Sequence, residues 1–109
     1  MKVLISDKLS QNAVSIFKTK GIHVDYLPEI PRAELKNIIA SYDGLAIRSN
    51  TKVDKEIIDL AKNLKIIGRA GIGVDNVDIN YATSKGIIVM NTPHGNSITT
   101  AEHTIAMIL

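Results

Sequence analysis

A complete strand–helix–strand unit is contained in residues 44–73, GLAIRSNTKVDKEIIDLAKNLKIIGRAGIG. The runs 44–47 and 65–69 are short and mainly apolar, which is typical of strands that are buried on both faces. The segment between them carries apolar residues at helical spacing. Because a strand that leads through a helix to a second strand pairs with it in parallel, the unit predicts a parallel sheet.

The same alternation continues on both sides of this unit. Further strands are expected at 3–5, 23–27 and 87–90, with helices that begin near Ser10 and Pro31 and another that ends at Lys85-Gly86. Five short apolar runs separated by helices predict an α/β protein with a flavodoxin-like (Rossmann-like) parallel five-stranded sheet and helices on both faces. Right-handed connections favour the strand order 2-1-3-4-5.

The composition excludes several kinds of site. The 109 residues are 45% hydrophobic and 22% charged, which suits one folded domain. The absence of cysteine excludes disulfides, zinc–thiolate sites, iron–sulfur clusters and a cysteine nucleophile. A net charge of +2 without a long basic run argues against nucleic-acid or membrane partners. No apolar stretch has the length of a signal peptide or membrane span, so we expect a cytoplasmic protein.

The last segment, 98–109, is unusual for the end of a chain. Thr99, Thr100 and Glu102 are typical of a helix start, but residues 104–109 are apolar on nearly every side. Such a helix needs partners on more than one face. The segment also ends without a cap, so we expect it to be the beginning of a longer helix and place a boundary between residues 97 and 98.

Polar residues follow the strands at the edge of the sheet where ligands bind in parallel α/β proteins. The candidate binding residues are Arg48, Ser49 and Asn50 after the third strand, and Arg69, Gly71, Ile72 and Gly73 at the end of the fourth. Guanidinium groups bind carboxylate or phosphate, and outward N–H groups of a glycine turn form an anion-binding concavity. A small anion is therefore the expected ligand. Two alternatives stay open: the arginines pair with carboxylates such as Asp75, and the glycines merely form a turn.

The sequence predicts no metal site and no catalytic residue. The turn 71–73 lacks the third glycine of the dinucleotide fingerprint and the acidic residue that follows it. Residues 75–78 fit turn and helix-cap positions and do not have the spacing of a calcium loop. His103 and Glu102 are adjacent on a helix and face different directions, so they cannot form a catalytic dyad.

A resemblance to one family runs through the segments 2–7, 42–49, 67–78 and 89–103 in order. They resemble the N-terminal part of D-isomer-specific 2-hydroxyacid dehydrogenases, and in particular of members that oxidise 3-phosphoglycerate, a phosphorylated 2-hydroxy acid, to 3-phosphohydroxypyruvate with NAD in serine biosynthesis. The resemblance implies that residues 1–97 form most of the substrate-binding domain. It implies that residues 98–109 begin a helix that crosses into a nucleotide-binding domain absent from this chain.

The resemblance also implies roles for the candidate residues. Arg48, Ser49 and Asn50 would meet the anionic end of the substrate. The amides of Gly71, Ile72 and Gly73 would hold its carboxylate, with Arg69 as a helper, and Ile72 and Thr100 would touch NAD. The family's dinucleotide fingerprint, catalytic arginine and glutamate–histidine pair lie in segments absent from this chain. We therefore expect this chain to be inactive alone and the parent enzyme to be a homo-oligomer.

Two other classes of protein remain possible. A signalling receiver shares this topology, but it needs a phosphorylatable aspartate at the end of the third strand, where this chain has Ile47-Arg48. A scaffold domain could use the apolar helix 98–109 for self-association.

Overall fold

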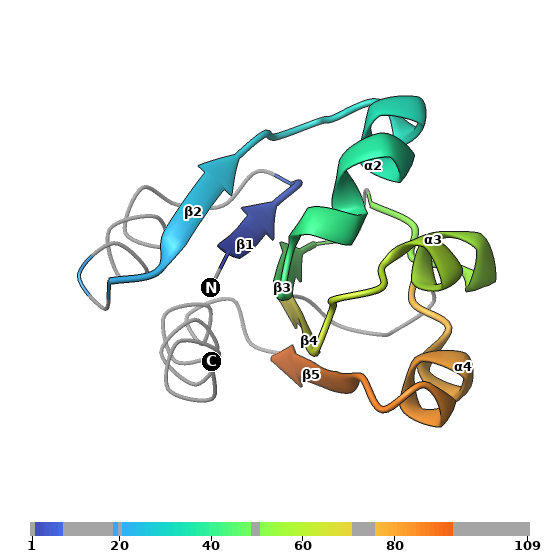
Figure 1. Ribbon diagram of the computed structural model, residues 1–109. Coiled ribbons are helices and arrows are strands. Elements are labelled where there is room, and N and C mark those ends of the chain that lie inside the picture. Colours follow the sequence, from blue (N-terminus) through green and yellow to red (C-terminus); the bar gives the residue numbers. More distant parts are fainter. Residues whose placement is uncertain (1, 8–18, 20, 49–50, 71–75, 93–109) are drawn as a thin grey trace.

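The computed structural model describes residues 2–7, 19, 21–48, 51–70 and 76–92. Within these ranges one five-stranded parallel sheet has the order β2-β1-β3-β4-β5 (Figure 1). The strands are β1 (Lys2–Ile5), β2 (His23–Tyr26), β3 (Gly44–Ile47), β4 (Ile66–Ala70) and β5 (Ile88–Thr92). All five predicted strands are present, and the predicted parallel order is confirmed.

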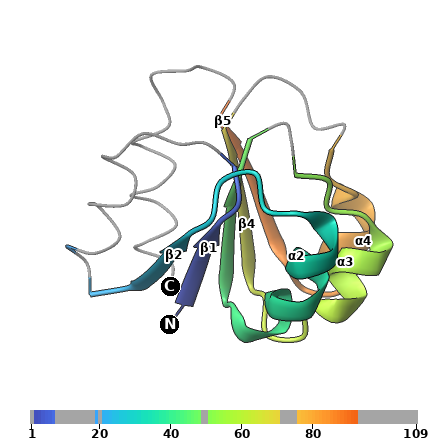
Figure 2. The ribbon, with the colours of Figure 1, turned by 90° about the horizontal axis from the view of Figure 1, so that it is seen from above.

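The described α-helices are α2 (Arg32–Ile38), α3 (Lys55–Leu60) and α4 (Ile79–Ser84), with a 3₁₀ turn η1 (Ile39–Ser41) directly after α2. Figure 2 shows that all three lie over the same face of the sheet. The helices expected near Ser10 and over 98–109 fall outside the described residues, so the expectation of helices on both faces stays a prediction for the second face. α4 ends as predicted, because Gly86 has a φ of 79°, the left-handed conformation that glycine adopts without strain.

Apolar side chains are buried on both faces of the central strands. The face under α2, α3 and α4 carries the larger core, in which Leu4, Leu45 and Ile67 are fully buried. On the other face Val3 and Ile66 are also fully buried. Burial on both faces explains why these strands have continuous apolar runs and no alternation of apolar with polar residues.

The helices of the described segments are short. The longest, α2, has seven residues, whereas a membrane-spanning helix needs about 20. No helix in these segments is therefore long and apolar enough to cross a bilayer.

A buried tyrosine links η1 to the edge strand β2. Tyr42 is only 4% exposed and donates its hydroxyl hydrogen to Asp25 Oδ2 at 2.5 Å. Burial, with a further contribution from Asp25, raises the pKa of Tyr42 to about 12. The same hydrogen bond lowers the pKa of Asp25. The folded protein therefore holds the Tyr42 proton more tightly than the unfolded chain does.

This hydrogen bond predicts a loss of stability at alkaline pH. The contribution of Tyr42 is complete below pH 10, the ordinary pKa of tyrosine, and is lost as the pH rises toward about 12. Asp59 raises the pKa of Tyr81, which acts in the same direction. The free energy of unfolding, measured with denaturant across this range, should thus fall less steeply in Tyr42→Phe than in the wild type. Parallel curves for the two proteins would contradict the assignment.

Candidate functional site

Strands β3 and β4 end side by side, as the sequence predicts. Ile47 and Arg69 are partners in the parallel register, so Arg48, directly after β3, lies at the edge of the sheet where β4 ends with Ala70. This is the carboxyl edge, where parallel α/β folds collect their ligands. The structure thus brings Arg48 close to Arg69, and β4 leads from this edge into the predicted glycine turn.

The two arginines have different surroundings. Arg48 is exposed, whereas Arg69 is only 5% exposed and donates its Nε–H to Oδ1 of Asn76. The sequence predicts the same anion-binding role for both arginines, because their spacing carries no information about the burial of either side chain. Arg48 is the one that can meet a ligand from solvent, and Arg69 is part of the structure of the edge.

Asn76 connects three segments of this edge. Its Nδ2 donates to the carbonyl oxygens of Arg48 and Thr51, both at 2.7 Å, while its Oδ1 accepts from Arg69. The backbone of Asn76 is held as well, because its carbonyl oxygen accepts from the N–H of Val53 at 2.7 Å. The sequence predicts a turn residue here, which is correct, but it carries no signal for partners 25 and 28 positions away.

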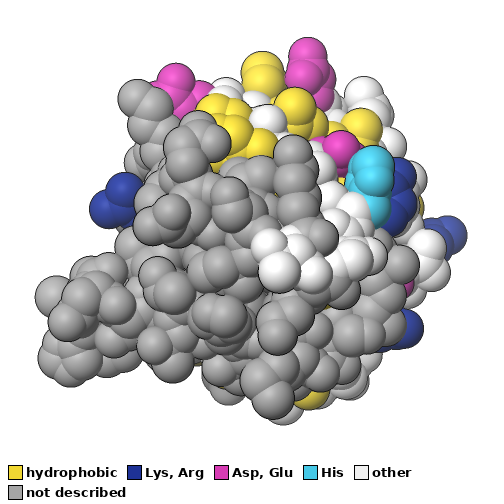
Figure 3. All heavy atoms as spheres, turned by 90° about the vertical axis from the view of Figure 1, so that its left-hand side faces the viewer, with side chains coloured by type: hydrophobic (Ala, Val, Ile, Leu, Met, Phe, Trp, Pro, Cys, Tyr) yellow, Lys and Arg dark blue, Asp and Glu magenta, His cyan; other side chains and the backbone are white. Residues whose placement is uncertain are grey.

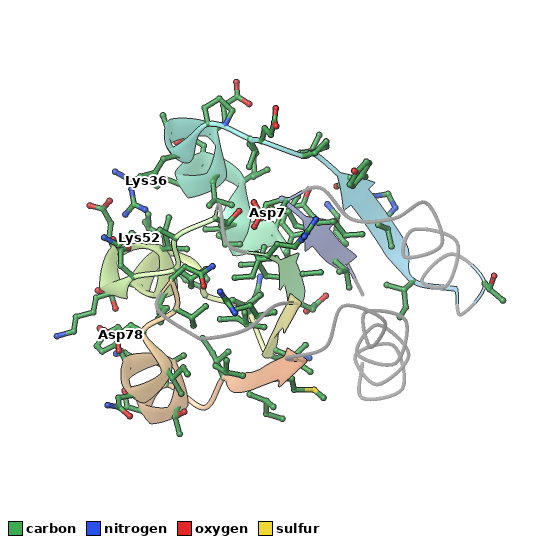
Figure 4. The ribbon with its side chains drawn as sticks, turned by 180° about the vertical axis from the view of Figure 1, so that it is seen from behind. Asp7, Lys36, Lys52 and Asp78 are labelled. Carbon is green, nitrogen blue, oxygen red and sulfur yellow. The ribbon has the colours of Figure 1, made fainter. Side chains whose placement is uncertain are left out.

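Asp7, directly after β1, binds the same two residues, Arg48 and Thr51, through their N–H groups. Its side chain is 1% exposed. Its Oδ2 accepts from the N–H groups of Arg48 at 2.7 Å and Thr51 at 3.1 Å, and its Oδ1 accepts from the Thr51 hydroxyl at 2.6 Å. Because that hydroxyl has a single hydrogen, the Ser6 hydroxyl, 2.8 Å away, donates to it. Figure 4 shows Asp7 near the centre of the molecule, with Lys36, Lys52 and Asp78 toward its outer side.

A cavity of about 640 Å³ opens next to Asp7. It is lined by Ser6, Asp7, Glu29, Ile30, Arg32, Leu35, Thr51, Lys52 and Asp54. At this cavity Arg32 binds Asp54 at 2.8 Å and Glu56 at 3.1 Å. Arg32 lowers the pKa of Asp54, and Lys36 together with Arg32 lowers the pKa of Glu56. The buried polar residues that line the cavity, Ser6, Asp7 and Thr51, form hydrogen bonds with one another.

Neither a metal nor a dinucleotide site is formed by the described segments. They contain no group of three or more histidine, aspartate or glutamate side chains that could hold a metal ion. Dinucleotide-binding folds place a glycine-rich turn after the first strand. Here Asp7 stands at that position, and its carboxylate would repel a pyrophosphate and already occupies the nearby N–H groups. The residues present therefore do not fit NAD at this place.

The remaining candidates do not belong to the part of the chain that the structure describes. Ser49, Asn50, Gly71, Ile72, Gly73 and Thr100 fall outside the described residues, as do Asp75 and His103. His23 lies on the edge strand β2 and contacts Asp25 at 3.2 Å with a largely exposed ring. Figure 3 shows the side of the molecule on which β2 lies. The lysine and arginine side chains of the described residues are scattered there and form no patch.

Comparisons with known proteins identify the family. A family model described as D-isomer specific 2-hydroxyacid dehydrogenase, catalytic domain, matches residues 3–106. The chain is 50% identical over 109 residues to D-3-phosphoglycerate dehydrogenase of Archaeoglobus fulgidus and 48% identical over 108 residues to that of Sus scrofa. The alignments cover 100% and 99% of this chain but only 21% and 20% of those proteins. The chain thus spans about a fifth of the length of these curated relatives.

A solved structure agrees with the sequence matches. The cofactor (NAD+)-bound 3-phosphoglycerate dehydrogenase of Entamoeba histolytica has a TM-score of 0.75 and 34% identity to this chain. The match covers 85% of this chain and 33% of that one. Because the family model matches nearly all of the sequence and the fold agrees, the chain belongs to the D-isomer specific 2-hydroxyacid dehydrogenase family.

Proposed function

We propose that this chain is the substrate-binding part of an NAD-dependent D-3-phosphoglycerate dehydrogenase, which oxidises 3-phosphoglycerate to 3-phosphohydroxypyruvate in serine biosynthesis. The names of the relatives support this substrate. The observation that carries the proposal is the exposed Arg48 at the carboxyl edge, directly after Ile47, which is the register partner of Arg69 on the neighbouring strand. A guanidinium group at this edge suits a small, doubly anionic acid.

Each candidate residue has a place in this proposal. Arg48, Ser49 and Asn50 bind the anionic end of the substrate, and the amides of Gly71, Ile72 and Gly73 bind its carboxylate. Arg69 helps to hold the substrate indirectly, from a buried place at the edge where it donates to Asn76. NAD contacts this chain at Ile72 and Thr100.

The proposed division of labour rests on the family of the chain and on its relatives, of which it spans about a fifth. Residues 1–97 serve as the substrate-binding domain, and residues 98–109 begin the helix that leads to the nucleotide-binding domain. Hydride transfer needs groups supplied by that domain, so this chain alone is inactive. The parent enzyme is a cytoplasmic homo-oligomer, and the fragment can self-associate through 98–109. The receiver alternative is disfavoured, because β3 ends in Ile47 and is followed by Arg48.

Titration of this chain with 3-phosphoglycerate tests the proposal. Amide signals of Arg48, Gly71 and Gly73 should shift in NMR spectra, while an assay with NAD should give no turnover. Absence of any shift at high ligand concentration would overturn the proposed substrate, and measurable NAD reduction would overturn the division of labour.

Arg48→Ala should weaken binding of 3-phosphoglycerate about tenfold or more, since it removes a charge-assisted, bidentate contact. Arg48→Lys should retain the charge but only part of the affinity. The matched control is Arg32→Ala on α2, which removes an arginine that binds Asp54 and Glu56 and should leave the dissociation constant unchanged. Equal losses in both alanine variants would point to a general charge effect and contradict a site at Arg48.

A further inference from the structure

The same two side chains, those of Asp7 and Asn76, bind the backbones of both Arg48 and Thr51. Arg48 and Thr51 flank the segment 49–50. Both of their N–H groups donate to the Asp7 carboxylate, and both of their carbonyl oxygens accept from the Asn76 carboxamide. The four distances lie between 2.7 and 3.1 Å.

Asp7 and Asn76 each have the hydrogen-bonding groups that their backbone partners require. A carboxylate has only acceptors, so Asp7 suits two N–H groups and a hydroxyl. A carboxamide has one acceptor and two N–H donors, and Asn76 has a protein partner for all of them: its oxygen faces Arg69 and its two hydrogens face the two carbonyl groups. Asn76 therefore connects the backbones of Arg48 and Thr51 to the buried arginine of β4.

We propose that Asp7 and Asn76 are positioning residues, which fix the backbones of Arg48 and Thr51 and the Arg69 guanidinium relative to each other, so that the substrate anion meets an arginine already in place. This inference rests on the proposed function. Neither residue needs to touch the substrate. The gain comes from holding the Arg48 backbone in place before binding, which removes an entropic cost that the ligand would otherwise have to offset. The cavity beside Asp7 is not required for this role.

Asn76→Asp separates the two contacts of Asn76. The variant keeps an oxygen for Arg69, and adds a charge there, but it places a carboxylate oxygen against two carbonyl oxygens. If Asn76 acts by holding the loop, the dissociation constant for 3-phosphoglycerate should rise about tenfold. Because the added carboxylate also repels the substrate anion, the neutral variant Asn76→Ala is measured beside it and should show a similar rise. If Asn76→Ala binds like the wild type, the loss in Asn76→Asp is charge repulsion alone and the proposal is overturned.

The matched control for this substitution is Asn63→Asp. Asn63 also donates its Nδ2–H to a backbone carbonyl, that of Ala40 at 2.8 Å, but it lies away from the carboxyl edge. Its variant should bind 3-phosphoglycerate like the wild type. Dissociation constants are compared at a temperature where melting curves show each protein fully folded, so that a loss of affinity is separated from a loss of stability.

Asp7 gives a second, independent test. Asp7→Ala should weaken binding by a similar factor, whereas Asp7→Asn keeps an oxygen for the two N–H groups and should restore most of the affinity. The control is Asp43→Ala, because Asp43 accepts a backbone N–H, that of Lys2 at 2.9 Å, at the opposite end of β1 and β3.

The outcomes distinguish the two proposals. A wild type that does not bind 3-phosphoglycerate overturns the proposed function before any variant is compared. A wild type that binds, with Asn76→Asp and Asp7→Ala no weaker than their controls, overturns the positioning role alone. Weaker binding in both variants with unchanged controls, together with recovery in Asp7→Asn, supports it.

Discussion

Replacing Ile67 with alanine should lower the free energy of unfolding by about 3 kcal/mol, because it removes a fully buried branched side chain and leaves a cavity. Ile67 lies on β4 in register with Leu45 on one side and Val89 on the other. It belongs to the larger core, on the face that α2, α3 and α4 cover. The backbone pairing on both sides limits how far the strand can move to fill the space.

The matched control is Ile88→Ala, the same substitution on the neighbouring edge strand β5. Ile88 is 49% exposed, so its variant should change the free energy of unfolding by less than about 1 kcal/mol. Urea unfolding curves of the two variants and the wild type measure both values. Similar losses at the two positions would mean that the packing of β4 and β5 differs from the one described.

The strands and their order were predictable because the signal for them is local. Each strand is a short apolar run that ends in a polar residue or a turn, and a parallel sheet with right-handed connections leaves few possible orders for five of them. The position of Arg48 beside Arg69 follows from the same reasoning, since both stand at the carboxyl ends of strands that the sequence already predicts.

The network that fixes this edge was not predictable in the same way. Asp7 bonds to Arg48 and Thr51, which lie 41 and 44 positions later, and Asn76 reaches back 25 and 28 positions. No periodicity connects such residues. A serine–aspartate pair after a strand or an asparagine in a turn is compatible with many local roles, and only the register of three strands brings these side chains together. The burial of Arg69 could not be predicted from the sequence for the same reason.

The register of the strands therefore sets the general position of the site, while a few polar side chains fix its details. Arg48 is exposed, yet its N–H and its carbonyl oxygen are both held by side chains from other segments. An exposed arginine on such a fixed backbone loses less conformational freedom when it binds an anion than one on an unrestrained loop would.

Asp7 is the residue on which this arrangement depends most. Asp7→Ala should lower the free energy of unfolding by about 2 to 3 kcal/mol, because the N–H groups of Arg48 and Thr51 and the Thr51 hydroxyl all lose their acceptor in a buried place. The adjoining cavity of about 640 Å³ lets water reach these groups, which keeps the loss of stability below that expected for three donors without any acceptor.

The control Asp43→Ala removes one acceptor from the N–H of Lys2 in a partly buried place and should lower the free energy of unfolding by about 1 kcal/mol. Denaturant unfolding measures both, and hydrogen exchange should quicken at the Arg48 and Thr51 amides in Asp7→Ala only. If Asp43→Ala were the more damaging change, the carboxyl edge would not depend on Asp7 in the way its hydrogen bonds indicate.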